Sequence, residues 1–413
     1  MPVLLPFRGL RPDPAVVGPL SDVVCPPYDV INQAQRLALL ERSPYNVVRI
    51  ELPDGDYDEA ADLLERWRVD GALARDQAAA LYGYRMTPDR GPAEPTRDAT
   101  WQTVGVIGAL VLGPPGTGIL PHEQTTPKAK SDRLELIRAT NANTSPIWCL
   151  CTAPGLSEAV NLAISEAAAA ASAGRAAASR AVDDDGCVHE LWPITDPAVH
   201  EAVAKAVGGG PLLVADGHHR YETALAYLAE RTAAGHLGRA SAIDASGGPA
   251  ALMALVVELA VDQLHVQAIH RLVCTAGADV VEAFKPDYDV TPTSSRGEAL
   301  LREMSRMGAV GLVTSTGAFL ARPRPGTAGA AFELDSSRVD ATLATIPAVA
   351  IEYQHDVAQA MESVSAGEAE AAVFCRPATV AQIAATAHGG ARMPPKTTFF
   401  SPKPRTGMVL RDW

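Results

Sequence analysis

Five consecutive residues near the middle of the chain, Asp216 to Arg220 (DGHHR), have the side chains best suited to chemistry. They directly follow an apolar run over residues 211–215 and precede an amphipathic stretch over 221–231. This pattern predicts that the cluster lies where a buried strand turns into a helix. A helix N-terminus presents backbone N–H groups and a partial positive charge, and both favour an anion such as a phosphate.

The individual side chains of this turn suit the same ligand. Gly217 lets the backbone approach a phosphate closely, and Arg220 can bind two phosphate oxygens at once. His218 and His219 add donors, and Asp216 has the chemistry to hold a metal or to orient a hydroxyl. The alternative is an Asp helix cap with solvent-exposed histidines, which explains a polar cluster between two apolar elements less well.

A second candidate is the loop His122-Glu123-Gln124, which follows a Gly/Pro-rich stretch and precedes several basic residues. A carboxylate beside histidine and basic groups has the chemistry of a general base. The same residues also suit a capping segment in front of a helix predicted over 131–140. The loop by itself favours neither explanation.

Two further segments carry weaker signals. Lys396, Thr397 and Thr398 lie in a tail punctuated by proline, where basic and hydroxyl groups on an extended chain could close over an anion. Taken alone, a terminal strand explains them better. His270 and Arg271 come after an apolar stretch, and they suit either a ligand-binding pair or a buried, hydrogen-bonded histidine.

Other common chemistries lack their sequence patterns. The chain has no G-x-S-x-G turn of a serine hydrolase, no G-x-G-x-x-G after a strand for a nicotinamide cofactor, and no Walker A loop. Cys149 and Cys151 form a single C-x-C pair, which in a strand places two structural thiols on one face and is weak evidence for zinc. Residues 182–186 (VDDDG) lack the downstream acidic pattern of a calcium loop and are predicted to form a solvated turn.

The charge balance argues against polyanionic partners. The chain has 48 Asp and Glu residues against 35 Lys and Arg, which gives a net charge of −13. Broad binding of nucleic acid or of an anionic membrane is therefore not expected, and a phosphate site would need its own local donors. Residues 1–9 lack a signal-peptide pattern, and the apolar run over 249–261 is too short to span a bilayer. These features predict a cytoplasmic protein that acts on small molecules.

The elements that must position these residues form a mixed pattern. The clearest segments are a helix over 57–74, strands over 79–86, 104–112 and 252–261, and an Ala-rich surface helix over 157–181. Proline and turn residues are so frequent over 1–55 that helix is not expected to propagate there. Because strands and helices mix without regular βαβ spacing, the predicted fold class is α+β.

Three of the polar segments together resemble the free serine kinases built on the ParB/sulfiredoxin fold. Those enzymes have a His-Glu-Gln loop first, an Asp-Gly-His-His-Arg turn second and a Pro-Lys-Thr-Thr segment third, and this chain has them in that order at 122–124, 216–220 and 395–398. The chain also resembles a large bacterial family of long, mostly uncharacterised proteins, with landmarks such as PFRGLRP, CPPYDVI, KSDR and MPPKTTFF. Arg8, Tyr28 and Asp29 in these landmarks could line the same cleft, but turns are the simpler explanation.

The resemblance implies a ParB/sulfiredoxin-like core with large insertions and mixed sheets. It suggests an N-terminal α/β region at 1–120 that packs on a catalytic core at 121–275. The Ala-rich segment at about 157–181 would be an insertion in that core. A C-terminal α/β region at 276–413 would carry the Pro-Lys-Thr-Thr segment.

The same resemblance implies an activity, in which ATP or ADP donates a phosphoryl group to the hydroxyl of a free amino acid, above all L-serine, giving O-phosphoserine. Glu123 would take the hydroxyl proton, and Asp216 would lie beside the hydroxyl or Mg²⁺. Mg²⁺ would be bound either through Asp216 or by the phosphates alone. The nucleotide phosphates would be bound by Gly217, His218, His219, Arg220, Lys396, Thr397 and Thr398. The weaker candidates for substrate contact are His122, Gln124, His270 and Arg271.

Departures from this pattern leave other functions open. Glu123 and Asp216 are 93 residues apart here, a much longer gap than in the short kinases. His218 stands where sulfiredoxin has its reactive Cys, and no helix-turn-helix is evident, so thiol repair and DNA partitioning are unsupported. A non-catalytic nucleotide-binding regulator and a nucleotide phosphohydrolase remain alternatives. The oligomeric state is open, with a homodimer as one option.

Overall fold

The computed structural model describes residues 1–88, 102–113, 118–121, 127–172, 179–235, 248–275, 277–325, 334–388, 393 and 396–413. The chain forms two compact units, and each is described by itself. Unit 1 comprises Met1–Leu264 and Pro402–Trp413, and unit 2 comprises His265–Ser401. These units divide the chain differently from the three regions expected from the sequence, because the last twelve residues return to unit 1.

Unit 1 is built on a mixed β-sheet. Its described strands are β1 (Leu4–Leu5), β4 (Leu81–Thr87), β5 (Thr103–Val111), β6 (Ile119–Pro121), β8 (Ile147–Cys151), β9 (Ser179–Val182), β10 (Val188–Ile194), β11 (Leu212–Asp216) and β12 (Ala251–Glu258). Their order is β6-β11-β8-β12-β5-β4-β10-β9, with β1 added beside β5. The β11–β6 and β12–β8 pairs are parallel and the others are antiparallel, which agrees with the predicted α+β class and mixed sheets.

The centre of this sheet is buried on both faces. Seven consecutive residues of β12, from Ala251 to Val257, are buried, and so are eight of β5, from Thr103 to Leu110. A strand that is covered on both faces needs apolar residues at every position, which explains the unbroken hydrophobic runs. Cys149 and Cys151 lie in this core, as the prediction of structural thiols requires.

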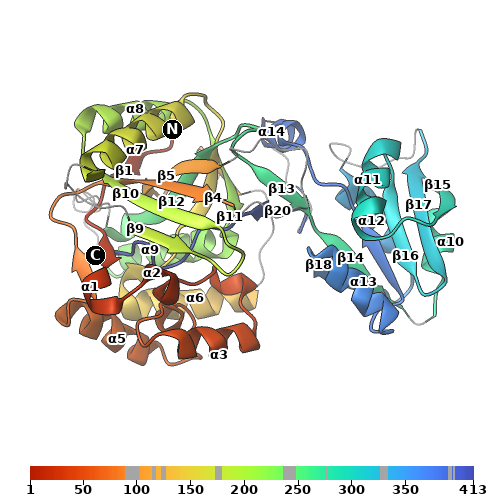
Figure 1. Ribbon diagram of the computed structural model, residues 1–413, viewed down its shortest axis with the longest axis horizontal. Coiled ribbons are helices and arrows are strands. Elements are labelled where there is room, and N and C mark those ends of the chain that lie inside the picture. Colours follow the sequence, from red (N-terminus) through yellow and green to blue (C-terminus); the bar gives the residue numbers. More distant parts are fainter. Residues whose placement is uncertain are drawn as a thin grey trace. The chain divides into compact units, whose positions relative to one another are not determined.

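Helices cover the sheet of unit 1. They are α1 (Pro14–Val17), α2 (Leu20–Val23), α3 (Gln33–Arg42), α4 (Val48–Glu51), α5 (Tyr57–Val69), α6 (Pro127–Thr140), α7 (Leu156–Ser172), α8 (Pro197–Gly208) and α9 (His218–Ala233), with short 3₁₀ turns η1 (Tyr28–Val30) and η2 (Gly248–Ala250). The helices α7 and α8 pack on each other, and α7 packs on β5 and β10. Figure 1 shows α3 and α5 gathered on the other side of the sheet from α7 and α8, and α6 packs on both α5 and α9.

The prediction that residues 1–55 would exclude helix is wrong for α3. The side chain of Asn32 accepts a hydrogen bond from the Gln35 backbone at 2.9 Å, and the Gln35 side chain accepts one from the Asn32 backbone at 2.9 Å. This reciprocal cap starts a helix in residues 28–43, the longest stretch of this segment that contains neither proline nor glycine. The high proline count of the whole segment concealed it.

Unit 2 is a six-stranded antiparallel sheet with helices on both faces. Its elements are α10 (Val280–Phe284), α11 (Gly297–Met307), α12 (Asp335–Leu343), α13 (Val357–Ser365), α14 (Val380–His388), β14 (His270–Cys274), β15 (Tyr288–Thr293), β16 (Val310–Thr314), β17 (Gly317–Pro323), β18 (Ala350–Gln354) and β19 (Ala371–Phe374). The strand order is β15-β17-β16-β19-β14-β18. Leu272 and Val273 belong to different apolar clusters, because neighbouring residues of a strand point to opposite faces. A separate ribbon pairs β13 (His265–Ala268) with β20 (Thr398–Ser401).

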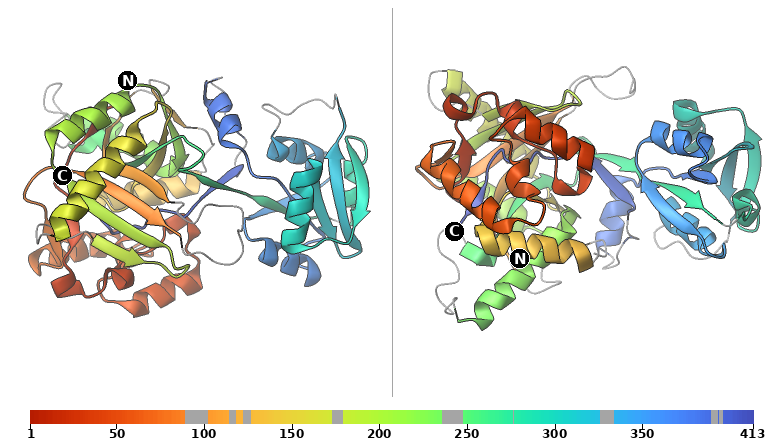
Figure 2. Two further views of the ribbon diagram at one scale, coloured as in Figure 1. Left: turned by 45° about the horizontal axis from the view of Figure 1, so that its top comes forward. Right: turned by 90° about the horizontal axis from the view of Figure 1, so that it is seen from below.

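The C-terminal strap, residues 402–413, is threaded through unit 1 (Figure 2). Leu410 forms a bridge with Leu10, and Thr406 forms one with Cys25. A pair of two-residue strands completes the attachment, in which β21 (Arg411–Asp412) pairs with β7 (Ala142–Asn143). Elsewhere in unit 1, β2 (Leu10–Pro12) pairs with β3 (Leu73–Arg75).

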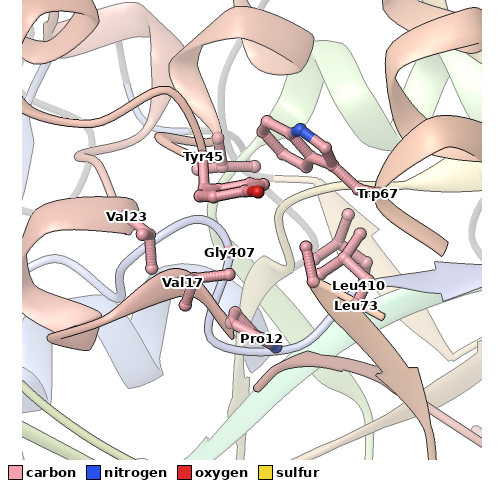
Figure 3. Close-up of a pocket in the computed structure, with 10 residues that line it drawn as sticks. Pro12, Val17, Val23, Tyr45, Trp67, Leu73, Gly407 and Leu410 are labelled. Carbon is pink, nitrogen blue, oxygen red and sulfur yellow. The ribbon is translucent and has the colours of Figure 1, made fainter. Parts of the chain in front are cut away.

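The strap lines one side of a small apolar pocket. Gly407 and Leu410 of the strap face Tyr45 and Trp67 across this pocket (Figure 3). Gly407 has a left-handed φ of +93°, and a Cβ there would lie 2.8 Å from the Val47 side chain. Glycine is therefore required for the strap to seat against the N-terminal helices.

Among the described residues, none of the helices combines the length and the apolar character needed to cross a bilayer.

Candidate functional site

The DGHHR segment has the predicted local geometry. Strand β11 ends at Asp216, and α9 begins at His218. Between them Gly217 has a left-handed φ of +89°, and a Cβ there would lie 2.8 Å from Ile147. Both the backbone conformation and the lack of space demand glycine. The turn therefore presents the first residues of a 16-residue helix, whose N-terminus carries the partial positive charge that favours anions.

The carboxylate of Asp216 is held between two cations. Lys403 of the C-terminal strap donates to Oδ1, and Arg220 donates to Oδ2 at 3.0 Å. Burial alone would raise the pKa of Asp216, but Lys403 first and Arg220 next hold it well below its usual range. Asp216 is therefore ionised, and both of its oxygens already accept hydrogen bonds.

Arg220 is fixed by several neighbours besides Asp216. Its Nη1 donates to Ser145 Oγ at 3.0 Å and to the Pro146 carbonyl at 2.6 Å. The ring of Tyr28 lies 5.9 Å from the guanidinium. The N-terminal landmark CPPYDVI thus contributes an aromatic side chain to this cluster, and Tyr28 also begins the 3₁₀ turn η1, as the turn interpretation expects.

A buried carboxylate, Glu51, anchors the other side of the cluster. Glu51 accepts a hydrogen bond from Thr144 Oγ1 and another from Ser145 Oγ at 3.0 Å, and its side chain is fully buried. Arg133 lies 3.7 Å from the same carboxylate and packs against the Tyr28 ring at 4.3 Å. The Ser145 hydroxyl is shared, so Glu51 and Arg220 belong to one hydrogen-bonded network.

The residues over 182–186 form a turn between β9 and β10, but Asp183 is not solvated. Its side chain is only 6% exposed and pairs with Arg405 of the strap at 2.7 Å. His189 Nε2 lies 3.0 Å from the same carboxylate, and His189 Nδ1 lies 2.9 Å from the Tyr84 hydroxyl. The Cys187 thiol is also near. Since a guanidinium already neutralises Asp183, the residues form an ion-pair network and do not fit a metal ion.

Unit 2 holds the weaker candidates His270 and Arg271. His270 is 2% exposed, and its Nδ1 accepts a hydrogen bond from the Cys375 backbone at 3.3 Å. Burial is the main reason that the pKa of His270 is lowered to about 4, and the positive charge of Arg271 lowers it further. Arg271 donates to both oxygens of Asp340, at 2.9 and 3.1 Å. These contacts match the buried, hydrogen-bonded alternative expected from the sequence.

The C-terminal candidates also lie in unit 2. Lys396 is exposed, and its backbone carbonyl accepts a hydrogen bond from Arg271 at 3.3 Å. Thr397 is buried, and its hydroxyl lies 3.0 Å from that of Ser336. Thr398 begins β20, the terminal strand expected as the alternative. The structure thus brings Lys396 and Arg271 together within one unit, while the DGHHR turn belongs to the other.

His122, Glu123 and Gln124 lie outside the described residues. The helix expected after them is present as α6, which begins at Pro127 rather than at 131.

A comparison with known protein families identifies the family of this chain. The family model described as "Protein of unknown function (DUF1015)" matches residues 4–343. The chain belongs to this family. No curated protein matches its sequence.

Solved structures are similar to this DUF1015 member only at a distance. A free serine kinase in complex with AMP has 16% identity and a TM-score of 0.37, with 74% of this chain and 91% of that one covered. A conserved hypothetical protein from Pyrococcus furiosus has 13% identity and a TM-score of 0.36, with 73% and 91% covered. SbnI with C-terminal truncation from Staphylococcus aureus has 13% identity and a TM-score of 0.36, with 73% and 85% covered. At these scores the similarity decides neither the fold nor the activity of this family member.

Sequence reasoning about this DUF1015 protein missed several residues of the cluster. Among the residues of the tail, the motifs single out Lys396, Thr397 and Thr398 but not Lys403, which pairs directly with Asp216. Glu51 carried no signal at all, and Arg133 appeared only within the KSDR landmark. The repeated basic residues of the tail, Lys403 and Arg405, were the one available hint, since each now pairs with a buried Asp.

Asp216 does not fit a resident Mg²⁺ in this arrangement. A cation at its carboxylate would lie against the Lys403 ammonium and the Arg220 guanidinium. The expectation that Asp216 binds Mg²⁺ is therefore not supported by these contacts.

Proposed function

We propose that this chain is a small-molecule kinase that transfers a phosphoryl group from ATP or ADP to the hydroxyl of a free amino acid, most specifically L-serine. The observation that supports it is the DGHHR turn, where Gly217 starts a long helix beside a compact group of cations. Arg220 is buried, and Lys403 is only 11% exposed. These groups form a local positive site within an acidic protein, as phosphate binding requires.

In this proposal the residues of unit 1 act mainly by position and charge. Phosphoryl transfer needs alignment and charge neutralisation more than covalent chemistry. The first turn of α9 binds phosphate oxygens through its backbone N–H groups, with His218, His219 and Arg220 beside it. Asp216 holds Arg220 and Lys403 in place, since it bonds to both. Glu123 takes the proton of the attacking hydroxyl.

In the decisive assay, the protein is incubated with ATP or ADP, Mg²⁺ and a panel of amino acids, and the products are measured by phosphorus NMR. Phosphoserine supports the kinase, and phosphate released without an amino acid product would instead indicate a hydrolase. Glu123→Gln should lower turnover about 100-fold or more, the usual contribution of a general base. The matched control is Glu135→Gln, which changes a half-exposed carboxylate on α6 and should leave turnover unchanged. Near-normal phosphoserine formation by Glu123→Gln would contradict the assignment.

Arg220→Lys tests the phosphate site. Lysine keeps the charge but loses the guanidinium fork, so AMP affinity measured by calorimetry should fall about 10-fold or more. Tryptophan fluorescence checks that the variant is folded. Unchanged AMP affinity in a folded variant would remove Arg220 from the phosphate site.

A nucleotide-binding regulator without turnover is the second candidate. It is favoured by one observation: both oxygens of Asp216 accept hydrogen bonds from cations, which makes Asp216 an anchor of the turn. Tight binding of AMP with no phosphoserine and no free phosphate in the NMR assay would establish this alternative.

A further inference from the structure

A small pocket lies in unit 1 next to Arg220 and is partly open to solvent. One part of its wall is apolar and includes Leu136 of α6 and Leu252 of β12. The rest is polar and comes from four separate parts of the chain. The polar side chains are Glu51, Arg133, Asn143, Thr144, Ser145, Arg220 and Thr223, and we call this space the Glu51 pocket.

Arg133 Nη2 lies 2.6 Å from Asp132 in an ion pair, but two other buried donors of residues that line the Glu51 pocket have no such partner among the described residues. They are the hydroxyl of Thr223 and the Nε–H of Arg220, and the two residues are only 4% and 8% exposed. A buried donor without an acceptor is costly, and native proteins usually supply water or a ligand for it. The pocket therefore calls for a group with acceptor oxygens.

The charges around the pocket limit which acceptor fits. Glu51 and Arg220 each bond to Ser145 Oγ at 3.0 Å, so a carboxylate and a guanidinium lie within about 6 Å of each other. A phosphate dianion would face the buried carboxylate, and an apolar molecule would leave both donors unmet. A zwitterion with a carboxylate and an ammonium group matches both signs.

We propose that the Glu51 pocket binds a small α-amino acid. Its carboxylate accepts from Arg220 Nε–H and from the Thr223 hydroxyl, and its ammonium group faces Glu51. The further claim that this amino acid is the phosphoryl acceptor rests on the proposed function. Arg220 then connects the two ligands, since it bonds to Asp216 at the phosphate turn and also lines the pocket.

The test is calorimetric titration of the full chain with glycine, acetate and inorganic phosphate, alone and after saturation with AMP. Glycine should bind in at least one of these states, and acetate and phosphate should bind more weakly. Thr223→Val removes one donor at constant shape and should weaken glycine binding about 10-fold. Thr140→Val is the matched control. It removes a buried hydroxyl of α6 that bonds within its own helix and does not line the pocket, so glycine affinity should not change.

Glu51→Gln tests the contact with the ammonium group separately from the contacts with the carboxylate. This substitution should weaken the binding of glycine and leave the binding of acetate unchanged, because only glycine carries the ammonium group. If Glu51→Gln does not fold, the Thr223→Val comparison decides. No glycine binding up to about 10 mM in either state, or equal loss in Thr223→Val and Thr140→Val, would overturn the pocket assignment. Phosphoserine formation with normal kinetics in Thr223→Val would leave the kinase standing and refute the pocket alone.

Discussion

Replacing Lys403 by Met tests whether the C-terminal strap holds the DGHHR turn. The change removes the ammonium group from Asp216 but leaves Arg220 bonded at 3.0 Å. The side chains of Lys403 and Asp216 are 11% and 16% exposed, so solvent can replace the lost ammonium group only in part. Complete loss of the partner of a buried charge costs about 3–5 kcal/mol, and one hydrogen bond to a charged group contributes about 1.5–3 kcal/mol. Because Arg220 remains, we expect the free energy of unfolding of unit 1 to fall by about 2 kcal/mol at pH 7.

The stability that Lys403→Met loses should be smaller at low pH than at neutral pH. Burial raises the pKa of Asp216, but Lys403 and Arg220 together lower it well below the unfolded value of about 3.9. The stability from this pair is therefore complete above that unfolded pKa and disappears as the pH falls through the folded pKa. Without Lys403, Asp216 takes up its proton at a higher pH. The difference between wild type and Lys403→Met should narrow from pH 7 to pH 3.

Tryptophan fluorescence during urea unfolding can measure this in unit 1 alone. All the tryptophans lie within the sequence of that unit, at positions 67, 101, 148, 192 and 413. Arg66→Met is the control, since it breaks an exposed pair with Glu59 and should change the free energy of unfolding by less than about 0.5 kcal/mol. A Lys403→Met effect as small as that control, or equal at pH 7 and pH 3, would refute the anchoring role.

Three further predictions concern packing and titration. Gly407→Ala should destabilise unit 1 by about 2 kcal/mol, which is more than Gly55→Ala. Both glycines have a left-handed φ, but only at Gly407 would a Cβ lie against a neighbouring side chain. Urea unfolding followed by tryptophan fluorescence compares the two variants. His270, with a pKa of about 4, is neutral when folded, so the free energy of unfolding of unit 2 should fall by about 2 kcal/mol from pH 7 to pH 5, and calorimetry of His270→Gln should show a flatter pH dependence. Cys274 is the one partly exposed cysteine, so a thiol reagent should modify it first and reach buried Cys149 only on unfolding; equal rates would contradict the packing of the core.

The candidate turn could be predicted from the sequence because its determinants are local. An apolar run, a glycine and an amphipathic stretch follow one another within 21 residues, from 211 to 231. Strand and helix periodicity and the left-handed preference of glycine act over that same range. The helix α3 was missed for a related reason. Its cap, Asn32 with Gln35, is also local, but the prolines around it dominated the composition of the segment.

The partners of that turn were decided by the tertiary structure. Lys403 reaches Asp216 across 187 residues of sequence, and Thr144 reaches Glu51 across 93. No periodicity or spacing encodes such pairings, because they exist only once the strap has returned to the sheet and packed on the N-terminal helices. The sequence by itself therefore determined where the glycine turn between strand and helix forms. The folded chain determined which charges surround it, since a buried carboxylate is stable only where packing brings cations and hydroxyl groups within hydrogen-bonding distance.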